Sequence, residues 1–260
     1  MSKKPDLRSF SGCILEGDGD FDEVNILGGL EAKGSLNANK VEINGSADIA
    51  GSLWADVVVV HGGLKTGVDI IVDNSINVMG GIKSGGKIKT YSLGVQGGVD
   101  VIEGITAHNI EIKGGLESKG GFIVEEKMEV IGGIYTTGDI KAKELYSIGG
   151  ITTMQSIDVR GKIEVSGEIK VDETIECDEF DFKIAGPSYI KGKLQANKIN
   201  IDLDERSSRE AFLRVEEIVS PNKIDIDYVI AEKVMCPKIK AGENCRIGQP
   251  VDYHFNPDKY

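Results

Sequence analysis

The chain has 260 residues, with 42 acidic against 30 basic side chains and a formal net charge of −12. This balance argues against nucleic acid as a main partner, because phosphate binding needs a basic face. No apolar run approaches the roughly 20 residues that span a bilayer, and the first residues lack the apolar stretch of a secretory signal. We therefore expect a cytoplasmic protein whose four cysteines are reduced.

Residues 1–10 are predicted to form a flexible tail, and a glycine repeat begins after them. Steps of 17 or 18 residues separate Gly28, Gly45, Gly62, Gly80, Gly97, Gly114, Gly132, Gly149 and Gly167. Apolar residues follow each glycine at fixed offsets, and Val41 and Ile43 are one of the alternating pairs. Such alternation predicts short strands with one buried face. A fixed period indicates one structural unit that is stacked many times.

The repeat predicts an all-β fold, a parallel β-helix of three-sided coils of 17–18 residues, over residues 11–201. Each coil has three short apolar runs separated by glycine corners, where glycine permits positive φ and close backbone approach. One coil cannot bury its apolar face alone, but stacked coils bury it in continuous rows. Inward positions are expected for Cys13 and Cys177, and an outward position for Trp54.

The pattern weakens after Ile201. Residues 202–217 are charged and largely lack the repeat, and we predict an insertion or loop there. Residues 218–248 resume the apolar spacing irregularly and are expected to form further coils. Residues 249–260 are predicted to be a C-terminal tail, because prolines at 250 and 257 interrupt any strand.

The candidate catalytic and ligand-binding residues all have simpler structural explanations. The three histidines, His61, His108 and His254, have no nucleophile beside them in sequence, and the chain lacks a nucleophile elbow. The spacing of Cys236 and Cys245 is not a zinc pattern. The glycine pairs open strands rather than a phosphate-binding helix. We therefore expect no catalytic residue, no cofactor, no metal and no small-molecule substrate.

The ends of the predicted solenoid are the candidate functional residues. Soluble solenoids normally carry capping segments with a polar outer face, and no long amphipathic capping helix is visible in the sequence. An uncovered strand edge is a template for pairing with another chain. The predicted polymerisation interface consists of Phe21, Val24 and Ile26 at the start of the stack and Ile239, Ile247 and Phe255 at its far end.

One segment has the repeat rhythm of a known family. Residues 40–55 read Lys-Val-Glu-Ile-Asn-Gly-Ser-Ala-Asp-Ile-Ala-Gly-Ser-Leu-Trp-Ala, which resembles the bactofilins, bacterial polymer-forming cytoskeletal proteins. The resemblance covers about residues 11–201 and implies a right-handed β-helix. It further implies nucleotide-independent filaments, flexible tails and, in some members, membrane attachment through the N-terminal tail. This chain departs from the compact family core in its extra coils and in the segment after Ile201.

The expected function is a cytoskeletal scaffold, not an enzyme, that assembles end to end with copies of itself. Client proteins or a membrane, reached through the N-terminal tail, are the further partners that this interpretation admits. One alternative is a monomeric β-solenoid that binds a partner on its side faces. Another is a β-helix enzyme acting on carbohydrate or acyl substrates. The alternatives differ in whether the ends or the sides of the stack make the contacts.

Overall fold

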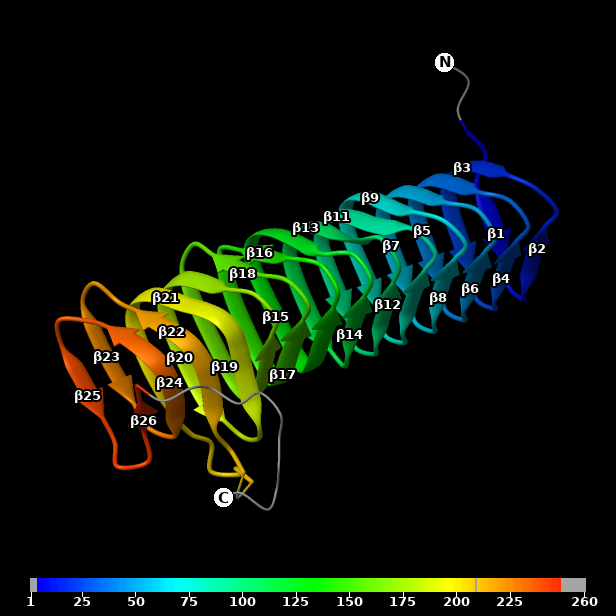
Figure 1. Ribbon diagram of the computed structural model, residues 1–260. Helices are drawn as coiled ribbons and strands as arrows, with labels where there is room; N and C mark the ends of the chain where they lie inside the picture. The colour runs from blue at the N-terminus through cyan, green and yellow to red at the C-terminus, as the bar shows by residue number, and fades with distance from the viewer. Residues whose placement is uncertain (1–3, 209, 249–260) are drawn as a thin grey trace. The chain divides into compact units, whose positions relative to one another are not determined.

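The computed structural model describes residues 4–208 and 210–248. The chain divides into two compact units, residues 1–126 and residues 127–260. In both units short strands pair in parallel with the strands one turn before and after them, and the described residues contain no helix. The predicted all-β parallel solenoid is confirmed, and Figure 1 shows the successive turns within each unit.

The first unit contains the strands up to the beginning of β15. They are β1 (Leu7–Ser9), β2 (Cys13–Leu15), β3 (Gly19–Ile26), β4 (Leu30–Ala32), β5 (Leu36–Ile43), β6 (Ala47–Ile49), β7 (Leu53–Val60), β8 (Leu64–Thr66), β9 (Ile70–Val78), β10 (Ile82–Ser84), β11 (Lys87–Val95), β12 (Val99–Val101), β13 (Gly104–Lys113) and β14 (Leu116–Ser118). The boundary between the units falls within β15 (Phe122–Thr136).

The second unit continues with strands of more variable length. They are β16 (Ile140–Ala142), β17 (Glu144–Thr153), β18 (Ile157–Val159), β19 (Lys162–Val171), β20 (Ile175–Ile184), β21 (Ser188–Leu203), β22 (Leu213–Val219), β23 (Lys223–Ile226), β24 (Val229–Met235), β25 (Ile239–Ala241) and β26 (Arg246–Ile247).

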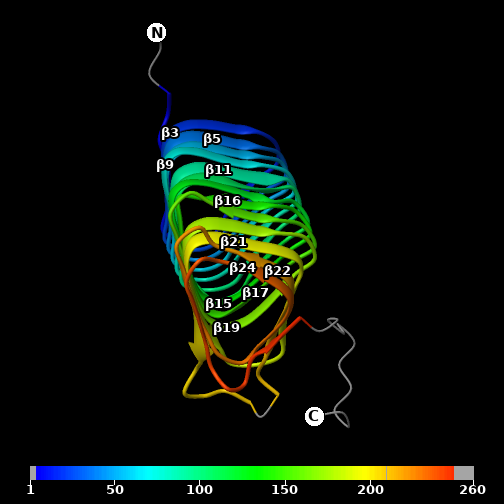
Figure 2. The ribbon, with the colours of Figure 1, turned by 60° about the vertical axis from the view of Figure 1, so that its left-hand side comes forward.

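Inward side chains pile up in rows because the coils pair in register. Leu36 pairs with Leu53, Leu53 with Ile70, and Ile70 with Ile88, and none of these side chains is exposed. Each such burial contributes roughly 1.5–3 kcal/mol relative to an exposed side chain. Figure 2 gives a view closer to the stacking direction, in which the turns of each unit overlie one another.

Glycine is required where the corners of adjacent coils meet. A Cβ atom on Gly45 would lie 2.6 Å from the carbonyl oxygen of Gly28 in the preceding coil. The Gly45 N–H donates a hydrogen bond of 3.1 Å to that same carbonyl. The glycine ladder of the sequence is therefore a ladder of backbone contacts, which leaves no room for a side chain.

The first strand lies within the segment that was expected to be an N-terminal tail. Leu7 and Ser9 pair in parallel with Val24 and Ile26 of β3, 17 residues further on. The repeat therefore begins one strand earlier than residue 11, because Leu7 occupies the same position of the coil as Val24.

The insertion is shorter than residues 202–217. Strand β21 continues to Leu203 and β22 already starts at Leu213, so the loop comprises the residues between them. Asp204 accepts hydrogen bonds from the Ser166 hydroxyl and from Arg206 Nε, the latter at 3.0 Å. These bonds, with those of Arg206 the stronger, hold the pKa of the Asp204 carboxyl well below its usual range. The predicted tail at 249–260 lies outside the described residues.

Candidate functional site

The N-terminal end of the first unit presents strand edges with a pairing partner on one side only. Within residues 4–126, β1 pairs with β3 and β2 pairs with β4, and no other strand pairs with them. Leu7, Cys13, Leu15 and Phe21 point inward there, but each remains partly exposed because the coil that would cover it is missing. This end therefore combines open backbone hydrogen-bonding groups with a cut surface through the apolar rows.

The C-terminal end of the second unit has the complementary arrangement. Among the residues described there, β25 pairs only with β23, and β26 only with β24. Ile239 continues the row of Ile224, and Ile247 continues the row of Ala231. Both isoleucines are 43% exposed, whereas their row neighbours are at most 2% exposed. Figure 1 shows β25 and β26 as the last strands of this unit.

The predicted interface residues fall into three groups. Ile239 and Ile247 lie on the exposed C-terminal end, and Phe21 lies partly exposed on the N-terminal end. Val24 and Ile26 are buried in the core, at 1% and 0% exposure, because β1 covers them. Phe255 lies outside the described residues.

Sequence reasoning missed Leu7 as an end residue, although a signal was present. Leu7 precedes Val24 by the same 17 residues that separate Val24 from Val41. Ser9 and Ile26 repeat the spacing. Extending the register backwards from β3 would have placed the end of these rows at Leu7 and Ser9.

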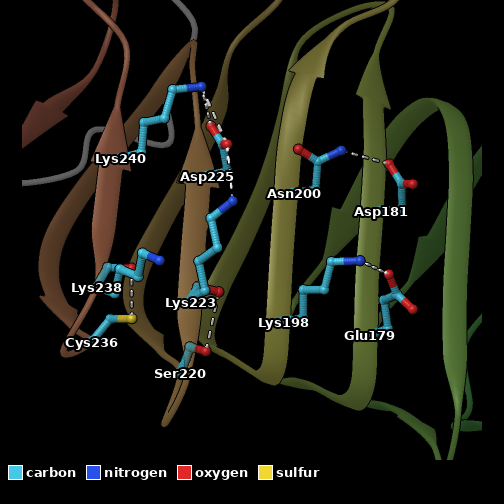
Figure 3. A network of polar contacts seen from close by, with 10 residues as sticks. All are labelled: Glu179, Asp181, Lys198, Asn200, Ser220, Lys223, Asp225, Cys236, Lys238 and Lys240. Carbon is cyan, nitrogen blue, oxygen red and sulfur yellow. Dashed lines mark hydrogen bonds and ion pairs between the residues drawn. The ribbon is translucent and has the colours of Figure 1, made fainter.

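The side faces carry polar side chains that pair with one another across neighbouring coils. Figure 3 shows part of this network in the second unit. The Lys198 ammonium donates to Glu179, and the Asn200 amide donates to Asp181 at 3.2 Å. Asp225 lies between two lysines, with Nζ distances of 3.4 Å to Lys223 and 3.2 Å to Lys240. On this face the charges are largely satisfied by their own ladder.

Removal of one ladder cation should have a small effect on stability. We expect Lys198→Met to lower the free energy of unfolding by about 1 kcal/mol or less, because exposed ion pairs are weak and solvent-screened. The difference between wild type and variant should vanish in 1 M salt, where the Debye length is about 3 Å. Urea titrations at low and high salt measure it. A loss that persists in high salt would mean that Lys198 acts through packing.

A second side-face feature lies in the first unit. Tyr91 stacks on His108, with ring centroids 4.4 Å apart, and His108 Nδ1 lies 3.0 Å from Glu125 Oε2. These three residues are spaced by 17 and line a groove of about 230 Å³. The Thr90 hydroxyl lines the same groove, but it donates to the backbone oxygen of Ser92. The arrangement orients a histidine without offering it a hydroxyl nucleophile in contact.

The cysteines show no metal-binding arrangement. The described part of the chain contains no cluster of three or more His, Cys, Asp or Glu side chains suited to a metal ion. All four cysteines are free thiols. Burial, aided by the neighbouring Asp178 and Glu176 carboxylates, raises the pKa of the Cys177 thiol to about 12. Cys177 is therefore a packing residue with little thiolate at neutral pH.

No helix among the described residues is long and apolar enough to cross a membrane. Comparison of the chain with protein-family models, with curated proteins and with solved structures gives no match.

Proposed function

We propose that this chain is a structural scaffold that assembles end to end with copies of itself into nucleotide-independent filaments. The observation that carries the proposal is the pair of open ends. Each presents unpaired parallel strand edges together with partly exposed aliphatic side chains that terminate buried rows. The bactofilin-like rhythm of residues 40–55 supports the same interpretation.

The two ends have matching coil positions. Strand β25 occupies the coil position of β1, because the row of Ile239 and Ile224 is the position that Leu7 and Val24 occupy in the first unit. By the same repeat, β26 corresponds to β2. A second copy can therefore extend the stack head to tail, with β1 on β25 and β2 on β26, at the ordinary strand spacing of about 4.8 Å. Such growth needs no nucleotide, since burial of the row ends and strand pairing supply the driving force.

Negative-stain electron microscopy of the purified full chain, without nucleotide or metal, tests the proposal. Long unbranched filaments are expected in reducing buffer across a salt series, because apolar contacts between ends are not screened by salt. Discrete short particles at every salt concentration would overturn the scaffold assignment. The groove at Tyr91 and His108 would then be the first place to search for a ligand.

A further inference from the structure

The row positions of the cysteines carry a further inference, which rests on the proposed end-to-end assembly. Cys13 starts an inward row of the first unit, where it pairs in register with Leu30. The row continues, one residue per coil, through Ala47, Leu64, Ile82, Val99 and Leu116. Each of these residues lies shortly after a glycine corner, where the short strand of the coil begins.

Cys245 ends the equivalent row of the second unit. That row runs through Ile134, Ile151, Ile169, Ser188, Leu213 and Val229. Ile230 pairs with Arg246, so Cys245 lies beside Val229. Ile134 follows Gly132 by two residues, as Leu30 follows Gly28. Cys13 and Cys245 therefore occupy the same coil position, one in the first coil of the chain and one in the last described coil.

The other two cysteines lack this placement. Cys177 lies within β20, pairs with Ala196 of the next coil and is largely buried. Cys236 follows β24, and its thiol contacts the backbone oxygen of Lys238 at 3.3 Å. Cys13 and Cys245 are both partly exposed at strand edges that have no further partner in the described residues.

We propose that Cys245 of one copy and Cys13 of the next form an intermolecular disulfide that locks the end-to-end contact. When β2 of one copy pairs in register on β26 of another, the two Cα atoms lie about 4.8 Å apart. A disulfide needs a Cα separation of about 4.4–6.8 Å and a Cβ separation near 3.8 Å. Edge strands that are paired on one side only can make the small shift that the Cβ atoms require.

The cross-link is a two-electron oxidation, for which oxidised glutathione is a sufficient acceptor. The Cys13 thiolate attacks one glutathione sulfur, forming a mixed disulfide and releasing one glutathione thiolate. Cys245 then loses its proton to solvent and attacks the Cys13 sulfur, releasing the second glutathione. Two protein thiols are oxidised to one disulfide and one glutathione disulfide is reduced to two thiols. Burial raises the pKa of the Cys245 thiol, so the second exchange should accelerate as the pH rises.

Non-reducing gel electrophoresis of the full chain, assembled in reductant and then equilibrated with oxidised glutathione, tests the lock. We expect a ladder of covalent dimers, trimers and longer species that collapses to monomer on reduction. Peptide mapping by mass spectrometry should identify the Cys13–Cys245 linkage in the wild-type protein. Cys13→Ser and Cys245→Ser should each abolish the ladder, whereas Cys236→Ser and Cys177→Ser are matched controls that should retain it.

The outcomes separate this inference from the proposed function. Filaments without a covalent ladder would overturn the disulfide lock and leave the scaffold standing. Dimers that persist in Cys245→Ser through a Cys13–Cys13 linkage would also overturn it, because they would reveal a two-fold contact between like ends. Absence of filaments in reductant would count against the scaffold itself. The wild-type peptide map identifies or excludes the Cys13–Cys245 linkage even if a serine variant fails to fold.

Discussion

Replacement of Gly149 by alanine should destabilise the second unit by about 2–4 kcal/mol. Gly149 has a φ of +133°, in a region that L-residues with a side chain rarely adopt. A Cβ atom there would lie 2.2 Å from the carbonyl oxygen of Gly132 in the preceding coil. The backbone of one coil would have to move away from the other, and the paired strands on either side would move with it.

A neighbouring glycine provides the control. A Cβ atom on Gly133 meets nothing within 4 Å. Gly133→Ala should therefore change the free energy of unfolding by less than about 1 kcal/mol, since reduced unfolded-state entropy offsets any small cost in the folded state. Urea denaturation followed by circular dichroism measures both variants. Equal midpoints for the two variants would contradict the close-contact explanation of the glycine corners.

The regular part of the fold could be predicted because the repeat encodes it redundantly. The spacing of Gly28, Gly45 and Gly62 sets the coil length, and the alternation at Val41 and Ile43 sets which side chains point inward. Each coil repeats the same pattern, so errors at one position do not change the conclusion. The same redundancy places Cys13 and Cys177 inward and leaves Trp54 39% exposed.

The ends were harder to predict because redundancy stops there. Val24 and Ile26 were expected at the interface, but three residues of β1 are enough to bury them. So short a strand has almost no pattern of its own, and only its 17-residue offset from β3 identifies it. The pairing of His108 with Tyr91 and Glu125 was missed for a related reason. Contacts between coils depend on outward positions, which the apolar pattern does not define.

A charge at the C-terminal end should prevent assembly while leaving the fold intact. Ile239 and Ile247 are each 43% exposed in the single chain, so aspartate at either position stays solvated and costs the fold little. In an end-to-end contact the same carboxylate would lose its water, which costs several kcal/mol. A cost of about 3 kcal/mol lowers the association constant roughly a hundredfold. We expect Ile239→Asp and Ile247→Asp to give discrete particles in electron microscopy.

The matched control for these variants is Met154→Asp. Met154 is 51% exposed in the same unit but does not lie on a terminal strand. This variant should form filaments as the wild type does, with an unchanged circular dichroism spectrum. Loss of filaments in all three variants would show that added charge, rather than its place at the end, controls assembly.

Mixing two end variants extends this test to the register of the contact. In the head-to-tail stack Ile247 of one copy lies over Leu15 of the next, because both occupy the same coil position. Leu15→Lys alone should block growth for the same desolvation reason as Ile247→Asp. An equimolar mixture should recover filaments, since the aspartate end can meet the lysine end and the two unmodified ends can meet each other. A mixture that remains particulate, although each variant is folded, would exclude this register, because opposite charges in contact offset each other's desolvation.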